Sequence, residues 1–112
     1  MEIWRLAIEY GEDLYKVADS LPSRELYGLG SQLRRGAVSI SSNIAEGSGS
    51  ASVADFGNFL NISIKSVLES ASQLEFALLR GYISREDKTR LYEKAEKIVR
   101  KIRSFKRSLT DR

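Results

Sequence analysis

Apolar residues recur along this chain at alternating steps of three and four, the spacing of one face of an α-helix. Within residues 1–21 this stripe consists of Ile3, Ala7, Tyr10, Leu14, Val17 and Leu21. The next stripe consists of Leu26, Leu29, Leu33, Ala37, Ile40 and Ile44. Pro22 separates the two segments, because the residue before a proline is displaced from helical geometry. The pattern predicts a second helix that begins after the N-cap Ser23 and ends at Gly47.

The second half of the chain carries two longer stripes of the same period. The third stripe consists of Phe56, Leu60, Ser63, Val67, Ala71, Leu74 and Leu78. The fourth stripe consists of Leu91, Ala95, Ile98, Ile102, Phe105 and Leu109. Ser52 and Ser84 each stand three residues before an acid, Asp55 and Asp87, which is the capping-box spacing of a helix N-terminus. The third helix is predicted to end at Gly81.

Four amphipathic helices joined by turns of about two to five residues favour antiparallel neighbours. The predicted fold is therefore all-α, an antiparallel up-down-up-down four-helix bundle. Residues 1–112 form a single domain, as expected for this length. Glycine weakens a helix interior unless it permits close packing. We therefore expect neighbouring backbone to approach closely at Gly11, Gly28, Gly30 and Gly36.

The composition excludes several kinds of chemistry. The chain contains neither cysteine nor histidine, so thiol nucleophiles, Cys/His metal sites and imidazole bases are absent, and we predict no metal and no cofactor. Glu46 is a lone carboxylate without a partner base, so we predict no enzymatic activity, and a cryptic enzyme is the least favoured hypothesis. No apolar run approaches the roughly 20 residues that span a bilayer. Acids interrupt the apolar pattern of residues 1–16, unlike in a signal peptide, so we expect a cytoplasmic protein with no membrane partner.

Positive charge is concentrated near the end of the sequence. Residues 88–112 contain ten Lys/Arg against three Asp/Glu, a net +7, whereas the first 87 residues carry a net −4. Cations that contact phosphates release counterions, which favours binding of RNA or DNA. The predicted nucleic-acid-binding residues are Arg34, Arg35, Lys94, Lys97, Arg100, Lys101, Arg103, Lys106 and Arg107. The alternative for the fourth helix is a solvated charged face.

Two groups on the second helix have both a structural and a functional interpretation. Arg34 and Arg35 point about 100° apart. Either one pairs with a nearby acid while the other is solvated, or they contact phosphate. A polar set shares one helix face and consists of Ser39, Ser42, Asn43 and Glu46. We expect a buried hydrogen-bond network that holds the end of this helix, and the alternative is a ligand pocket or subunit contact.

The segment YGLGSQLRRGAVSISSNIAEGSGS, residues 27–50, resembles the signature of the bacterial four-helix-bundle family named after the 23S rRNA intervening-sequence proteins. Further matches along the chain are Trp4, Pro22, Glu25, Asp55-Phe56, Phe59-Leu60, Ser66, Glu69 and Gly81-Tyr82-Ile83. Two positions depart from the family pattern. Ser41 replaces a proline, and its hydroxyl can bond back to the preceding turn. Lys65 replaces a glycine, which argues against a close helix contact at that position.

The resemblance implies an antiparallel four-helix bundle that assembles into a ring-shaped homopentamer. Together with the basic fourth helix, it leads to the hypothesis of a non-enzymatic oligomer that binds nucleic acid. The alternative is a protein–protein interaction scaffold or adaptor with no nucleic-acid role. Salt separates the two hypotheses, because phosphate binding weakens steeply with ionic strength and an apolar contact does not.

Overall fold

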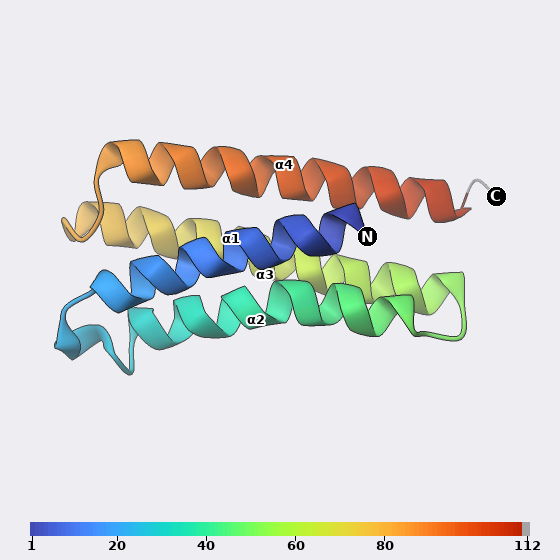
Figure 1. The fold of residues 1–112 in the computed structure, drawn as a ribbon, viewed down its shortest axis with the longest axis horizontal. Coiled ribbons are helices and arrows are strands. Elements are labelled where there is room, and N and C mark those ends of the chain that lie inside the picture. The colour runs from blue at the N-terminus through green and yellow to red at the C-terminus, as the bar shows by residue number, and fades with distance from the viewer. Residues whose placement is uncertain (111–112) are drawn as a thin grey trace.

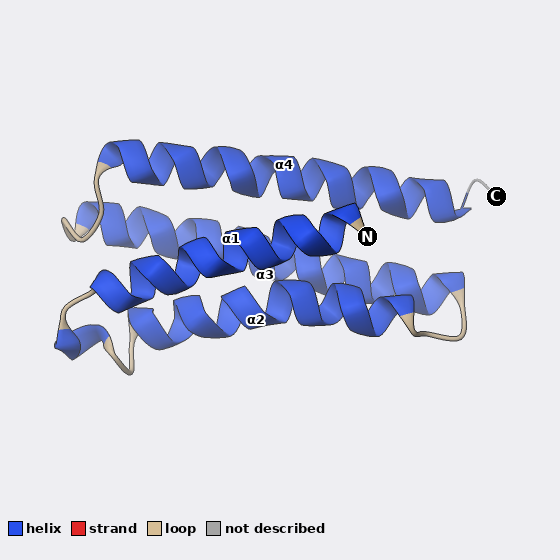
Figure 2. Ribbon diagram, in the orientation of Figure 1, coloured by secondary structure: helices blue, strands red, loops and turns tan. Residues whose placement is uncertain are grey.

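The computed structural model describes residues 1–110 and consists of four long α-helices that alternate in direction (Figures 1 and 2). The helices are α1 (Glu2–Ser20), α2 (Leu29–Ser48), α3 (Val53–Leu79) and α4 (Arg85–Thr110), and a short 3-10 helix, η1 (Ser23–Glu25), lies between α1 and α2. The described residues contain no strand. The predicted all-α, up-down-up-down four-helix bundle is therefore confirmed.

The core is built from the predicted apolar stripes. Its fully buried large side chains are Tyr10, Leu14, Leu33, Ile40, Ile44, Leu60, Val67, Leu74, Leu91, Ile98 and Ile102. Burying one such aliphatic side chain contributes about 1.5–3 kcal/mol, which makes this core the main driving force for the fold. α2 packs extensively against both α1 and α3, whereas α4 packs mainly on α3 and less on α1.

Three buried hydroxyl groups, of Tyr10, Ser63 and Ser70, make hydrogen bonds within the core. The Tyr10 hydroxyl donates to Ser70 Oγ at 2.7 Å, because Ser70 Oγ itself donates to the Val67 carbonyl at 2.6 Å. Burial raises the pKa of Tyr10 to about 12, although the bond to Ser70 opposes the rise. Ser63 Oγ donates to the Ile40 carbonyl at 2.7 Å and thereby links α3 to α2. These bonds fix the register of three helices from within the core.

The predicted termini of α3 and the predicted start of α4 are confirmed. Ser52 Oγ accepts from the Asp55 amide at 3.1 Å, and Ser84 Oγ accepts from the Asp87 amide at 3.0 Å. Gly81 follows α3 with a φ of +77°, a conformation that residues with a side chain rarely adopt. The amide after it, of Tyr82, donates to the Ala77 carbonyl at 2.8 Å, so the turn closes in a Schellman motif.

Both predicted ends of the second helix were wrong. The segment after Ser23 forms only η1, the backbone breaks at Gly28, and α2 begins at Leu29, which leaves Leu26 exposed. At the other end α2 continues through Ser48, so Gly47 lies inside the last turn. A Cβ on Gly47 would lie 2.7 Å from Phe56 Cδ1, so this glycine lets α3 pack closely rather than ending the helix.

The remaining glycines differ in what surrounds them. A Cβ on Gly11 would lie 3.0 Å from the Ala37 carbonyl oxygen, and one on Gly30 would lie 2.9 Å from the Glu25 carbonyl oxygen. Close backbone approach is therefore confirmed at both positions. Apart from its chain neighbours and the adjacent backbone of α2, no atom lies within 4 Å of a Cβ placed on Gly36, so close packing does not explain that residue and the expectation there was wrong.

α4 is longer than α1 and continues past the N-terminus of α1 (Figure 1). Its last turns therefore have α3 beside them, without α1 on the other side. There Phe105 meets Phe56 edge-to-face, with ring centroids 5.5 Å apart. This arrangement leaves much of the basic surface of α4 open to solvent.

Candidate nucleic-acid interface

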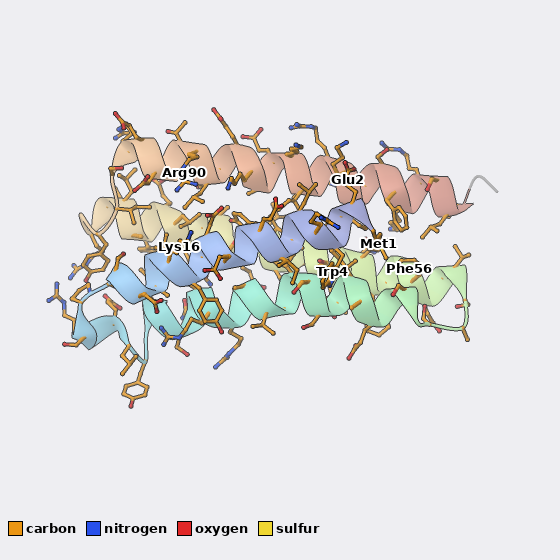
Figure 3. The ribbon with its side chains drawn as sticks, viewed as in Figure 1. Met1, Glu2, Trp4, Lys16, Phe56 and Arg90 are labelled. Atoms are coloured by element: carbon orange, nitrogen blue, oxygen red, sulfur yellow. The ribbon has the colours of Figure 1, made fainter. Side chains whose placement is uncertain are left out.

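The cations of α4 that face α1 are neutralised by acids of α1. Lys94 Nζ lies 2.6 Å from Asp13 Oδ2, and Lys101 Nζ lies 3.4 Å from Glu2 Oε1. Figure 3 shows Glu2 on α1 lying beside α4. Lys97 lines the same small hollow as Glu9. Because carboxylates already occupy this side, it is a poor surface for phosphate.

Near its start α4 also pairs with α3, through Lys88 Nζ at 3.1 Å from Glu75 Oε2, but the α3-facing cations of its second half have no carboxylate partner among residues 1–110. They are Arg100, Arg103, Lys106 and Arg107. The three arginines are exposed, whereas Lys106 is half-buried, and Lys106 Nζ donates to Asn61 Oδ1 at 3.0 Å. Lys65 of α3 joins them across the helix boundary and is exposed as well. We call Lys65, Arg100, Arg103, Lys106 and Arg107 the α3–α4 cation cluster.

Sequence reasoning missed Lys65 as a member of this cluster. The sequence singled out Lys65 only because it replaces the family's glycine. Lys65 is exposed, which agrees with the expectation that no close helix contact occurs at this position. Only the register of α3 against α4 brings Lys65 to the same hollow as Arg103 and Arg107. Lys65 and Arg103 are 38 positions apart in the sequence, and a contact over that separation leaves no signal in the local pattern.

Two hollows run end to end between α3 and α4, and Leu68 and Arg103 line both. The first has a volume of about 420 Å³ and is lined by Val67, Leu68, Ala71, Tyr92, Ala95, Glu96, Val99, Arg100 and Arg103. The second, of about 490 Å³, is lined by Asn61, Ile64, Lys65, Leu68, Arg103, Lys106 and Arg107. Together they form what we call the α3–α4 groove, which is apolar at one end and cationic at the other.

Arg34 has a structural role that neither interpretation anticipated. Its Nη2 donates to the Leu26 carbonyl at 2.9 Å, so it secures the connection between η1 and α2. No ion pair joins Arg34 or Arg35 to an acid within the described chain. Arg35 is exposed and lines a polar hollow between α2 and α3. Both arginines therefore lie apart from the α3–α4 cation cluster.

The predicted polar network forms only in part. Asn43 Nδ2 donates to the Ser39 carbonyl at 2.8 Å and to Ser39 Oγ at 3.1 Å. Ser39 Oγ lies 2.8 Å from Ser66 Oγ, a residue of α3 that the helix-face pattern could not supply. Ser42 and Glu46 are exposed, so their inclusion in a buried network was wrong. The two partly buried serines tie the middle of α2 to the middle of α3.

Ser41, which stands where the family pattern has proline, is 7% exposed and sits on the buried side of α2. Its Oγ donates to the Val38 carbonyl at 3.4 Å, as expected for a hydroxyl bonding to the preceding turn. α2 runs without interruption through this position.

Within residues 1–110, no group of three or more acidic side chains is placed to hold a metal ion. None of the helices described is long and apolar enough to cross a membrane. The chemistry that the α3–α4 groove offers is anion binding, because guanidinium groups donate paired hydrogen bonds to phosphate and lysine adds a point charge.

The fold and this groove define a class of protein: a small four-helix bundle with a cationic edge between its last two helices. The chain belongs to the 23S rRNA-intervening sequence protein family, whose model matches residues 1–104. Among solved structures it is similar to a protein of unknown function from the S23 ribosomal protein family of Bacteroides thetaiotaomicron. The two share 25% sequence identity over 94% of this chain and 95% of the other, with a TM-score of 0.86. A search of curated proteins found no match.

Proposed function

We propose that this protein binds nucleic acid through phosphate contacts along the α3–α4 edge, without enzymatic activity. The observation that carries the proposal is the α3–α4 cation cluster, whose arginines have no carboxylate partner within the described chain although α4 also carries acids. Holding several like charges together is unfavourable in the free protein, and an anionic ligand relieves that repulsion. A cytoplasmic location belongs to the same proposal.

The salt dependence of such binding follows from the number of cations. Five phosphate contacts give a slope of log K against log salt of about −3.5 for a single strand and about −4.5 for a duplex. The cations facing α1 add little to this slope, because phosphate would have to displace Asp13 or Glu2 from them. Neutralising the α3-facing cations of α4 should therefore reduce the salt slope of binding, whereas neutralising the α1-facing cations should leave it nearly unchanged.

The test compares two triple variants that remove the same charge from α4. The first is R100Q/R103Q/R107Q, on the side facing α3, and the second is R90Q/K94Q/K101Q, on the side facing α1. Binding of labelled RNA and duplex DNA is measured across a salt series. We expect the first variant to lose most of its affinity and about two units of salt slope, and the second to retain its slope.

Equal losses in both variants would show that net charge alone attracts the ligand and would overturn the assignment to the α3–α4 edge. Absence of binding by the native protein at low salt would overturn the nucleic-acid function itself. The chain would then be better explained as an adaptor for a protein partner, and the groove would be the place to look for that partner.

We further propose that the protein is a homo-oligomer, for which the resemblance suggests a pentamer. The support is a row of exposed apolar side chains on α1, Trp4, Ile8 and Tyr15, with exposed fractions of 42%, 44% and 37%. Val38 of α2, next to the residue that Gly11 contacts, is 51% exposed. Exposed apolar surface of this kind commonly marks a protein interface. A monomer mass by light scattering would contradict the proposal.

A further inference from the structure

Phosphate binding by the cation cluster does not account for the apolar floor of the α3–α4 groove. Its floor is formed by side chains that are almost completely buried, Val67, Ala95 and Val99, with the half-buried Tyr92 and Ala71 beside them. Leu68 stands at the junction of the two hollows and is 53% exposed. An apolar side chain this exposed beside a hollow is an available contact surface rather than part of the core.

The charges along the groove are distributed unevenly. Four cations and no carboxylate line the hollow near Arg107, whereas Glu96 accompanies Arg100 and Arg103 in the apolar hollow. Glu96 repels phosphate, so an anionic backbone is attracted to the cationic end. The ligand must therefore be anionic along one part and carry apolar or aromatic groups that reach the other part.

We propose that the α3–α4 groove binds single-stranded nucleic acid, with phosphates on the cation cluster and unpaired bases against the apolar floor. This inference rests on the proposed function and specifies the ligand of the same site. Single-strand binders combine a cationic groove with surfaces that contact base faces. Glu96 supplies a hydrogen-bond acceptor for an amino group on the base edge. The volume of about 420 Å³ lies within the usual range of ligand pockets, about 300–1,000 Å³.

A duplex fits this groove poorly for a physical reason. Its base faces are stacked inside the helix, so the sugar–phosphate strands would meet the apolar floor. Placing charged phosphates against buried valine and alanine side chains removes their water without replacing its hydrogen bonds. A single strand avoids this cost, because its bases turn away from the phosphates and leave them at the cationic end.

The test uses Leu68→Asn, which removes an exposed apolar contact without opening the core. Leu79→Asn is the matched control, since Leu79 lies on the same helix, is 73% exposed and is outside the groove. Fluorescence anisotropy measures binding of an unstructured RNA of about 12 nucleotides, and of the same strand annealed to its complement, at one salt concentration. We expect the native protein to bind the single strand more tightly, and Leu68→Asn to weaken that binding about tenfold while duplex binding is unchanged.

The outcomes separate this inference from the proposed function. If Leu68→Asn binds the single strand like the native protein, while R100Q/R103Q/R107Q still loses binding, the base contact is wrong and the phosphate contact stands. If Leu68→Asn weakens single strand and duplex equally, selectivity for unpaired bases is wrong. If Leu68→Asn lowers the oligomer mass in light scattering, the groove is a contact between subunits and the inference fails. Failure of every oligonucleotide to bind the native protein would overturn both proposals.

Discussion

The Tyr82 hydroxyl donates a 2.9 Å hydrogen bond to Glu25 Oε2, joining η1 to the turn between α3 and α4 across 57 positions of sequence. The other carboxylate oxygen of Glu25 accepts from the Leu29 amide at 3.2 Å, at the start of α2. Arg24 and Arg80 approach the Tyr82 ring, with guanidinium carbons 5.8 Å and 5.9 Å from its centroid. A single carboxylate therefore organises one end of the bundle.

The first prediction concerns the pH dependence of this contact. The Leu29 amide and then the Tyr82 hydroxyl hold the pKa of Glu25 below its usual value, because both bond to the charged carboxylate. Tyr82→Phe removes the second of these donors, so we expect the pKa of Glu25 to move part of the way back. Carboxyl NMR titration measures this shift, and an unchanged pKa would contradict the role given to Tyr82.

The sign of the stability effect follows from the lowered pKa. A group whose pKa is lower in the folded state stabilises the fold above its unfolded value, about 4.3 for glutamate, and loses that contribution as pH falls. The stability difference between native protein and Tyr82→Phe should therefore be largest near neutral pH and shrink below about pH 4. Urea unfolding at several pH values checks this trend.

The second prediction concerns the hydroxyl pair in the core. Tyr10→Phe removes a donor, and Ser70 still bonds the Val67 carbonyl, so the cost should be about 0.5–1.5 kcal/mol. Ser70→Ala leaves the buried Tyr10 hydroxyl without a partner, and we expect a larger loss of about 1–3 kcal/mol. The double variant should lose less than the sum of the two. Denaturant melts provide all three values, and a larger loss in Tyr10→Phe than in Ser70→Ala would contradict this reading.

The raised pKa of Tyr10 also predicts how the stability of the fold changes at alkaline pH. Its pKa is about 12 in the folded protein, above the ordinary value of 10.0, chiefly because burial disfavours the phenolate. The contribution of the protonated Tyr10 to folding stability is therefore fully present below pH 10 and is lost as pH rises towards 12. Tyr10→Phe lacks the group, so its stability should fall less between pH 9 and about pH 11 than that of the native protein.

The third prediction uses two glycines of one helix as a matched pair. Gly36→Ala adds a methyl group to open space, and we expect α2 to gain about 0.5–1 kcal/mol from reduced backbone freedom in the unfolded chain. Gly47→Ala places the same group 2.7 Å from Phe56 and 2.8 Å from Phe59, so we expect a loss of about 1–3 kcal/mol. Thermal melts give the sign of each effect. Stabilisation by Gly47→Ala would show that α3 can shift away freely.

The local pattern was sufficient for the helices and their apolar faces. The first stripe is buried at every position except Leu21, which is half-buried, because a helix of period 3.6 has only one face that can leave water together. The caps at Ser52 and Ser84 were predictable for the same reason, since each serine bonds an amide three residues away. The family signature added an identity that periodicity alone does not provide.

The sequence by itself determined four amphipathic helices, the short turns before α3 and α4, and the excess of positive charge on the last helix. Only the tertiary structure decided which of those charges are available. Lys94 and Lys101 are paired because α4 lies against the acids of α1, and Lys65 joins Arg103 because α3 lies on the other side. The close approach of α3 to Gly47 and the hydrogen bond between Tyr82 and Glu25 likewise depend on which segments lie together in the folded chain. Helix periodicity is a property of neighbours along the chain, whereas charge pairing depends on which helix faces lie together, and this is fixed only when the core has packed.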